Sequence, residues 1–193
     1  MFKKFLILVL FSLLISCGDD VSNEFTGSDI SAANLDASFS LMNQFGERVS
    51  LDTYKNKVIA VFFGFTNCPD ICPTSLQELK FIKQKLGDLG ESFQVLFVTL
   101  DPERDTQEKL KLFIPSFDPT FIGLHGTNEE INKIASQYKV FHQKVEQGDS
   151  YTIDHSSGIY FIDRQGKIRI RHPYGSSVEG IISDVRKLLS ESI

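Results

Sequence analysis

The chain has 193 residues, enough for one domain and an N-terminal appendage, and a hydrophobic content of 41% with 17 Phe can build a core. Its formal net charge is −5 and its basic residues do not cluster, which argues against a nucleic-acid partner.

Residues 1–16 have the features of a lipoprotein signal peptide. Lys3 and Lys4 precede an apolar stretch at 5–15, which is shorter than the roughly 20 residues of a membrane span but suits the central region of a signal. The segment that ends at Cys17 resembles a bacterial lipobox, whose cysteine becomes lipidated. An uncleaved anchor, or ordinary cleavage nearby, are the alternatives. We expect the protein in the cell envelope, lipid-anchored to a membrane through Cys17, with its domain outside the cytoplasm (on the periplasmic side in a Gram-negative cell).

The chain after this cysteine changes in composition near residue 38. Residues 17–37 are polar and rich in turn formers, so we predict a lipidated cysteine followed by a flexible tether. A random coil of about 20 residues spans roughly 25 Å. The folded domain is predicted over 38–193.

The first half of this domain begins with a predicted β-hairpin, in which alternating residues at 39–41 and 49–51 flank a turn at 43–46. Continuous apolar runs at 58–64 and 95–100 predict strands buried on both faces. Between them, Leu and Ile at helical spacing predict a helix that runs to Leu86.

The second half continues the alternation of strands and helices. The patterns predict a helix that starts around 101–105 and ends before Pro115, a strand at 121–124, a helix from a capping box at 127–130 through Tyr138, a hairpin of strands at 158–163 and 167–171, and a helix at 178–189. The order predicts an α/β, thioredoxin-like fold with an N-terminal β-hairpin and a central mixed sheet flanked by helices.

The domain has only two cysteines, and both lie in the motif Cys68-Pro-Asp-Ile-Cys72, directly after a predicted strand. A sulfur near a helix N-terminus is stabilised as thiolate, which favours metal binding and disulfide exchange. In a thioredoxin-like fold, the loop before the 158–163 strand passes beside the cysteines, so His155 is expected nearby. Two thiolates and an imidazole suit copper, as Cu(I) or Cu(II), with zinc as the alternative.

These and other polar residues also have plainer possible roles. Cys68 and Cys72 could form a structural disulfide, neither is expected to be needed in the core, and His155 could be an ordinary surface histidine. The histidines at 125, 142 and 172 are not predicted as ligands, and the one at 172 is expected to face solvent. The remaining expectations are a cap or site-edge role for Asp101, a turn role or orientation of His155 for Asp154, and a surface pair of Arg104 with Asp105.

Three segments of the chain, at 62–75, 98–106 and 154–157, resemble the Sco/SenC family of copper-binding proteins, and the likeness extends over about residues 35–190. The resemblance implies copper binding by Cys68, Cys72 and His155, which are all present, with Cys68 and Cys72 forming a disulfide when oxidised. It also implies membrane tethering, here through Cys17 in place of an anchor helix. The implied partner is subunit II of cytochrome c oxidase, whose dinuclear copper centre would receive copper or reducing equivalents.

The sequence therefore supports a metallochaperone or assembly factor. One alternative is a thiol-disulfide oxidoreductase that reduces the cysteines of a copper site without copper transfer, with Cys68 and Cys72 as its redox pair. A peroxidase of thioredoxin-like fold is another. His155 discriminates between these functions, because a dithiol reductase or a peroxidase works without it and the metal site does not.

Overall fold

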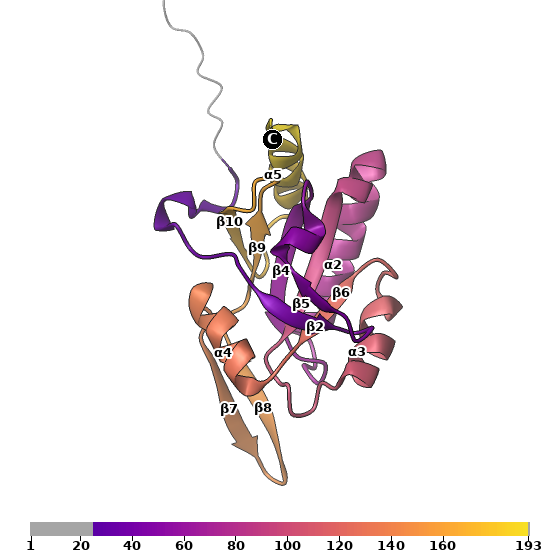
Figure 1. Cartoon of the computed structure of the whole chain (residues 1–193), viewed down its shortest axis with the longest axis vertical. Helices are drawn as coiled ribbons and strands as arrows, with labels where there is room; N and C mark the ends of the chain where they lie inside the picture. The colour runs from indigo at the N-terminus through magenta and orange to yellow at the C-terminus, as the bar shows by residue number, and fades with distance from the viewer. Residues whose placement is uncertain (1–24, 193) are drawn as a thin grey trace, which may run out of the picture.

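The computed structural model describes residues 25–192, so the predicted signal peptide and Cys17 lie outside the described residues. Within this range, no helix combines the length and the apolar character needed to cross a membrane. The core of the domain is an eight-stranded mixed sheet (Figure 1). Its strands, from one edge to the other, are β1 (Ser28–Asp29), β10 (Ile168–Pro173), β9 (Gly158–Ile162), β4 (Val58–Gly64), β5 (Phe93–Thr99), β6 (Ile122–His125), β2 (Ser40–Asn43) and β3 (Arg48–Ser50).

The centre of the sheet consists of the two apolar runs identified in the sequence. β4 and β5 are parallel and every residue in both is buried, because helices or other elements cover both faces. β6 extends the parallel part, whereas β9 pairs antiparallel with β4 and β2 antiparallel with β6. The predicted thioredoxin-like α/β fold with an N-terminal hairpin is confirmed.

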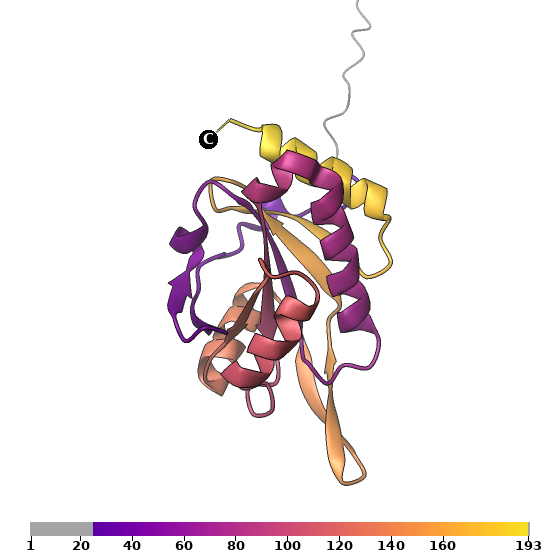
Figure 2. The ribbon, with the colours of Figure 1, turned by 90° about the vertical axis from the view of Figure 1, so that its right-hand side faces the viewer.

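Successive residues of β4 alternate between two hydrophobic cores, as the strand period requires. One core, on the face covered by three helices, contains Val58, Ala60 and Phe62. The other core, on the face covered by a single helix, contains Ile59 and Val61. Figure 2 shows this layering, with α2 and α5 together on one side of the sheet. The helices are α2 (Ile71–Leu86), α3 (Gln107–Phe113) and α5 (Val178–Ser190) on the first face and α4 (Asn128–Gln137) on the second. Short 3-10 helices lie at Ser31–Ala33, Leu51–Tyr54, Gly87–Ser92 and Ile114–Ser116.

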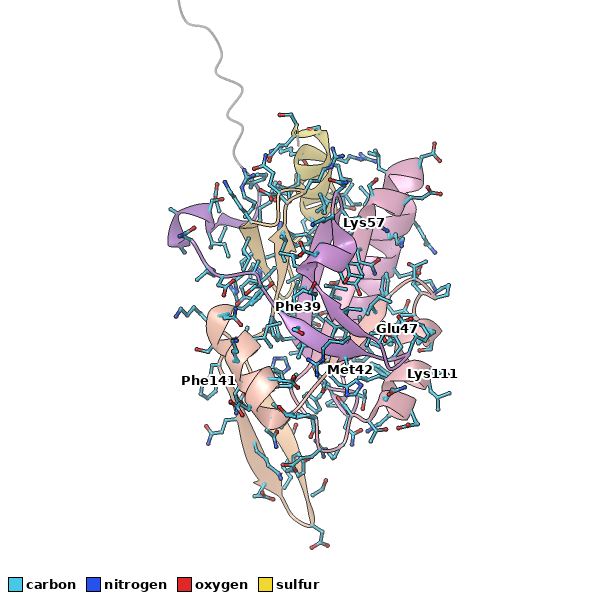
Figure 3. The ribbon with its side chains drawn as sticks, in the orientation of Figure 1. Phe39, Met42, Glu47, Lys57, Lys111 and Phe141 are labelled. Atoms are coloured by element: carbon cyan, nitrogen blue, oxygen red, sulfur yellow. The ribbon has the colours of Figure 1, made fainter. Side chains whose placement is uncertain are left out.

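One hairpin was not predicted. β7 (His142–Gln147) and β8 (Ser150–His155) pair only with each other and form a two-stranded sheet that projects from one end of the domain (Figures 1 and 2). Phe141, just before β7, is 57% exposed and lies at the outer edge of the domain beside α4 and β7 (Figure 3). The sequence of β7 has no alternation of apolar residues, because neither of its faces is buried.

The N-terminal segment differs from the predicted tether. β1 pairs with β10, and the backbone amides of Thr26 and Gly27 donate to the carboxylate of Asp184 in α5, at 2.9–3.0 Å. His172 was expected to face solvent but is 2% exposed, and its Nε2 lies 2.9 Å from the same carboxylate. Residues 25–37 therefore belong to the folded domain, and a boundary at residue 38 is too late.

Candidate metal centre

The cysteine motif connects the end of β4 to the start of α2. α2 begins at Ile71, so Cys68 precedes the helix and Cys72 is its second residue. The side chain of Asp70, at the N-cap position, makes no capping hydrogen bond; instead, the Cys72 amide donates to Sγ of Cys68 at 3.4 Å. The sulfur of Cys68 thus accepts one of the unpaired amides of a helix N-terminus, the environment that favours a thiolate.

The two thiols have opposite acidities. Hydrogen bonding from the Cys72 side chain, then from the backbone amides of Cys72 and Asp70, together with the charge of His155, lowers the pKa of Cys68 to about 5 even though burial opposes this. The pKa of Cys72 is raised, because its thiol donates to Cys68 and because it is buried. The pair therefore carries one negative charge near neutral pH, and this charge is on Cys68.

The exposure of the cysteines separates their roles. Both are free thiols, with Cys68 half-buried and Cys72 fully buried in the core. The expectation that neither is needed in the core is therefore wrong for Cys72. Gly64 makes room for it, because a Cβ at Gly64 would lie 2.7 Å from Sγ of Cys72. The half-buried Cys68 is the sulfur that solvent or a partner can reach.

A buried carboxylate holds the loop that precedes Cys68. Asp105 is fully buried and accepts hydrogen bonds from the amide of Thr66 at 2.9 Å, from the Thr66 hydroxyl and from Thr99 Oγ1 at 2.6 Å. The predicted surface pair of Arg104 and Asp105 is therefore wrong, since Arg104 pairs with Asp101 instead. The segment 101–105 forms turns and precedes α3, which starts at Gln107.

His155 ends β8, at the same end of the sheet as the cysteines. Its ring lies edge-on to Phe65, with centroids 6.0 Å apart. Nδ1 lies 3.0 Å from the carbonyl oxygen of Ser156; because a carbonyl only accepts, Nδ1 is the donor, and in the neutral ring Nε2 then has the lone pair. An imidazole nitrogen in this state is a metal ligand. Asp154 was considered as the residue that orients His155, but it is exposed and the contact is made by Ser156.

The structure brings the two cysteines together, and His155 lies against Phe65, three residues before Cys68. No three His, Cys, Asp or Glu side chains within residues 25–192 lie close enough to hold one metal ion in this conformation. The donor types fit a thiophilic ion, and coordination by all three residues remains a prediction. Of the other histidines, His142 is the cross-strand neighbour of His155 and its Nε2 contacts Asn132 at 2.9 Å, while His125 ends β6.

Sequence reasoning missed several residues that build this end of the domain. Gly64, Thr66 and Ser156 support the cysteines and His155 through the contacts given above, and the only signal for them was their position next to predicted ligands. For Asp101 the sequence allowed either a cap or a site-edge role. Asp101 is buried, its carboxylate accepts a hydrogen bond from Tyr151 Oη at 2.8 Å, and it also pairs with Arg104. It therefore links β5 to the unpredicted hairpin.

The fold and the paired cysteines define a thioredoxin-like domain with a dithiol at the first turn of a helix. The profile of the SCO1/SenC family matches residues 27–190, so the chain belongs to this family. The SCO2-like protein RC0895 of Rickettsia conorii is 40% identical over 139 residues, which cover 70% of this chain and 67% of that protein.

Solved structures agree with this assignment. Bradyrhizobium japonicum ScoI with copper bound has a TM-score of 0.72 and 36% identity, over 78% of this chain and 97% of that one. A SCO1/SenC family lipoprotein from Bacillus anthracis has a TM-score of 0.73 and 25% identity, over 86% and 99% of the two chains. BsSco, a member of the Sco family of cytochrome c oxidase assembly proteins in which a disulfide switch was identified, has a TM-score of 0.66 and 27% identity, over 82% and 96%.

Proposed function

We propose that this protein binds copper through Cys68, Cys72 and His155 and serves in the assembly of cytochrome c oxidase. The observation that carries the proposal is the thiolate of Cys68 beside Cys72, with an imidazole that keeps Nε2 available at the same end of the sheet. Two sulfurs and an imidazole nitrogen are soft and borderline donors, which suit copper. The copper-bound relative and the family of assembly proteins support it.

We further propose that copper is cargo, delivered to the dinuclear copper centre of oxidase subunit II. The half-buried Cys68 lets an acceptor thiolate approach and replace it as a ligand, while the buried Cys72 is shielded. Attachment to a membrane through a lipid on Cys17 would keep the domain beside a membrane-bound acceptor; the lipoprotein relative supports this.

Thiol reduction is the second candidate, because the two cysteines differ in acidity as an attacking and a resolving thiol do. The Cys68 thiolate would attack a disulfide sulfur of the partner and expel one partner thiolate. Cys72, on losing its proton, would then attack Sγ of Cys68 and release the second partner thiolate. The products are a partner dithiol and a Cys68–Cys72 disulfide, so two electrons pass to the partner. An external dithiol reductant must return the pair to its reduced state.

An anaerobic copper titration of the reduced protein tests the ligand set. Cys68→Ser or Cys72→Ser should abolish tight binding, and His155→Ala should weaken it while still allowing disulfide exchange. The matched control is His142→Ala, which removes the histidine directly opposite His155 in the hairpin and should leave affinity unchanged. If His155→Ala binds Cu(I) and Cu(II) as tightly as the parent, the three-ligand site is wrong. If the parent binds zinc in preference to copper, the copper function is wrong.

A further inference from the structure

The β7–β8 hairpin carries His155 but is not part of the main sheet. The ladder partner of His155 is His142, in the same hairpin, so within the described residues no strand of the eight-stranded sheet pairs with it. An isolated two-stranded hairpin is marginally stable in water. Its orientation relative to the cysteines therefore depends on side-chain contacts along its length.

Tyr151 of β8, whose ladder partner Glu146 lies near the turn of the hairpin, makes several of these contacts. The guanidinium carbon of Arg104 lies 3.6 Å from the centroid of the Tyr151 ring, and Nη1 of Arg104 donates to the Tyr151 carbonyl at 2.7 Å. The ammonium of Lys144 also contacts the ring, 3.8 Å from its centroid. The hydroxyl of Tyr151 donates to Asp101 at 2.8 Å. One residue of the hairpin is thus held through its ring, hydroxyl and backbone.

Arg104 is itself firmly placed. It pairs with Asp101, which is 2% exposed, and its own side chain is 20% exposed. Its Nη2 is buried and finds no hydrogen-bond acceptor in the described part of the chain. Leaving a buried donor unpaired costs free energy. The other contacts of Arg104 must offset this cost, and these are the stacking on Tyr151 and the hydrogen bonds that Nε and Nη1 donate.

The strand period connects this contact to the metal centre. Tyr151, Ile153 and His155 share one face of β8, and Ile153 is buried in the core that also includes Phe65. His155 in turn lies against Phe65. His155 and the two sulfurs are not within metal-binding distance of one another in this conformation. The position of the hairpin therefore determines how far the imidazole must move to bind an ion held by the two sulfurs.

We propose that Arg104 and Tyr151 are positioning residues of the metal centre: they clamp the β7–β8 hairpin to the segment between β5 and α3 and so restrict His155 to the neighbourhood of Cys68 and Cys72. The inference rests on the proposed copper site. A hairpin held in advance loses less conformational freedom when His155 binds the ion. Residues that orient a ligand in this way typically contribute about 10–100-fold in metal affinity.

A double-mutant cycle tests the clamp. Copper affinity is measured by competition with a chromophoric Cu(I) chelator, on the reduced full-length protein in detergent. Tyr151→Leu, which retains the buried Asp101–Arg104 pair, should weaken binding about 10-fold. In the His155→Ala background the same change should have less than about a 2-fold effect, because the clamp acts through His155. Equal weakening in both backgrounds, unchanged affinity, or tighter binding of Tyr151→Leu would each overturn the proposal.

A second readout does not require copper. Amide hydrogen exchange over β7 and β8 should be faster in Tyr151→Leu than in the parent protein, and unchanged exchange would overturn the clamp even if the parent bound no copper. Arg104→Gln should reproduce both effects. Arg169→Gln is the matched control, since Arg169 also pairs with carboxylates and lies over an aromatic ring, that of Phe25. Arg169 is near the start of β10, at the end of the sheet opposite His155. This substitution should alter neither affinity nor hairpin exchange.

Discussion

Cys68 and Cys72 are neighbours with opposite surroundings, and the difference comes from the residues between β4 and α2. The Cys68 sulfur accepts from the first turn of the helix, while the Cys72 sulfur is enclosed by the core and by the space that Gly64 leaves. A nucleophile or a metal ligand must be deprotonated. At neutral pH, Cys68 already meets this condition and Cys72 reaches it only when a metal or a reaction partner removes its proton.

The first prediction concerns the acidity of Cys68. Alkylation of Cys68 by iodoacetamide in the reduced protein should stay fast from pH 8 to about 6 and fall to half near its pKa of about 5. The Cys72 thiol is the largest cause of this low value, so Cys72→Ala should move the midpoint upward. Cys72→Ser keeps a donor and should move it less. Mass spectrometry gives the rate at Cys68 alone, and identical midpoints in the three proteins would contradict the assignment.

At the scale of elements, the sequence was most informative where burial imposes a pattern. The strand at 58–64 was predicted to the residue, and the capping box at Thr127 and Glu130 is present at the start of α4. The β7–β8 hairpin was missed because β7 has no buried residue and β8 has only one, Ile153, so neither strand shows an apolar alternation. His155 could be singled out as a ligand from the sequence, whereas the Ser156 carbonyl that fixes its tautomer depends on backbone geometry.

β1 was missed for a related reason. Residues 25–30 read as turn formers, and their attachment depends on Asp184, 158 residues away from Thr26. The second prediction follows from this contact: Asp184→Ala should lower the free energy of unfolding by about 3 kcal/mol, because it removes the acceptor of the Thr26 and Gly27 amides and leaves the buried ring of His172 unpaired. Chemical denaturation measures the change. Asp88→Ala, at an exposed aspartate, should have little effect.

The third prediction is the pH dependence of the same contact. Burial lowers the pKa of His172 below its ordinary 6.5, so the unfolded chain binds a proton that the folded chain does not. The contribution of neutral His172 is fully present above about pH 6.5 and is lost as the pH falls below it. Stability of the parent should therefore drop between pH 7 and 5, and His172→Gln should show a smaller drop over the same range. The pKa of Asp184 is also lowered, mainly by the bonds from Thr26 and Gly27 against the opposing effect of burial; its contribution is lost only below about pH 4. Equal slopes in the two proteins between pH 7 and 5 would show that His172 is not the group responsible.

At the scale of the whole molecule, the described chain begins at the end of the domain opposite the cysteines. Phe25 lies beside Arg169 and Lys187, near the start of β4, whereas Cys68 follows the end of that strand and the β7–β8 hairpin extends further in the same direction (Figure 1). Seven residues rise about 20 Å along β4. The chain from Cys17 therefore enters the domain at the end opposite the dithiol.

The last prediction separates the tether from the domain. Residues 18–24 remain between Cys17 and Phe25, and they reach at most about 25 Å when extended and roughly 15 Å as a random coil. Deleting residues 20–24 should reduce cytochrome c oxidase assembly in cells while thermal unfolding and copper affinity stay unchanged, and a scrambled segment of equal length should restore assembly. Deleting residues 26–30 removes β1 and the amides that donate hydrogen bonds to Asp184, so it should lower the unfolding temperature.

The boundary between tether and domain is misplaced if the first deletion destabilises the protein or if the second does not. Intact assembly after the first deletion would mean that the reach of this segment does not limit contact with the acceptor.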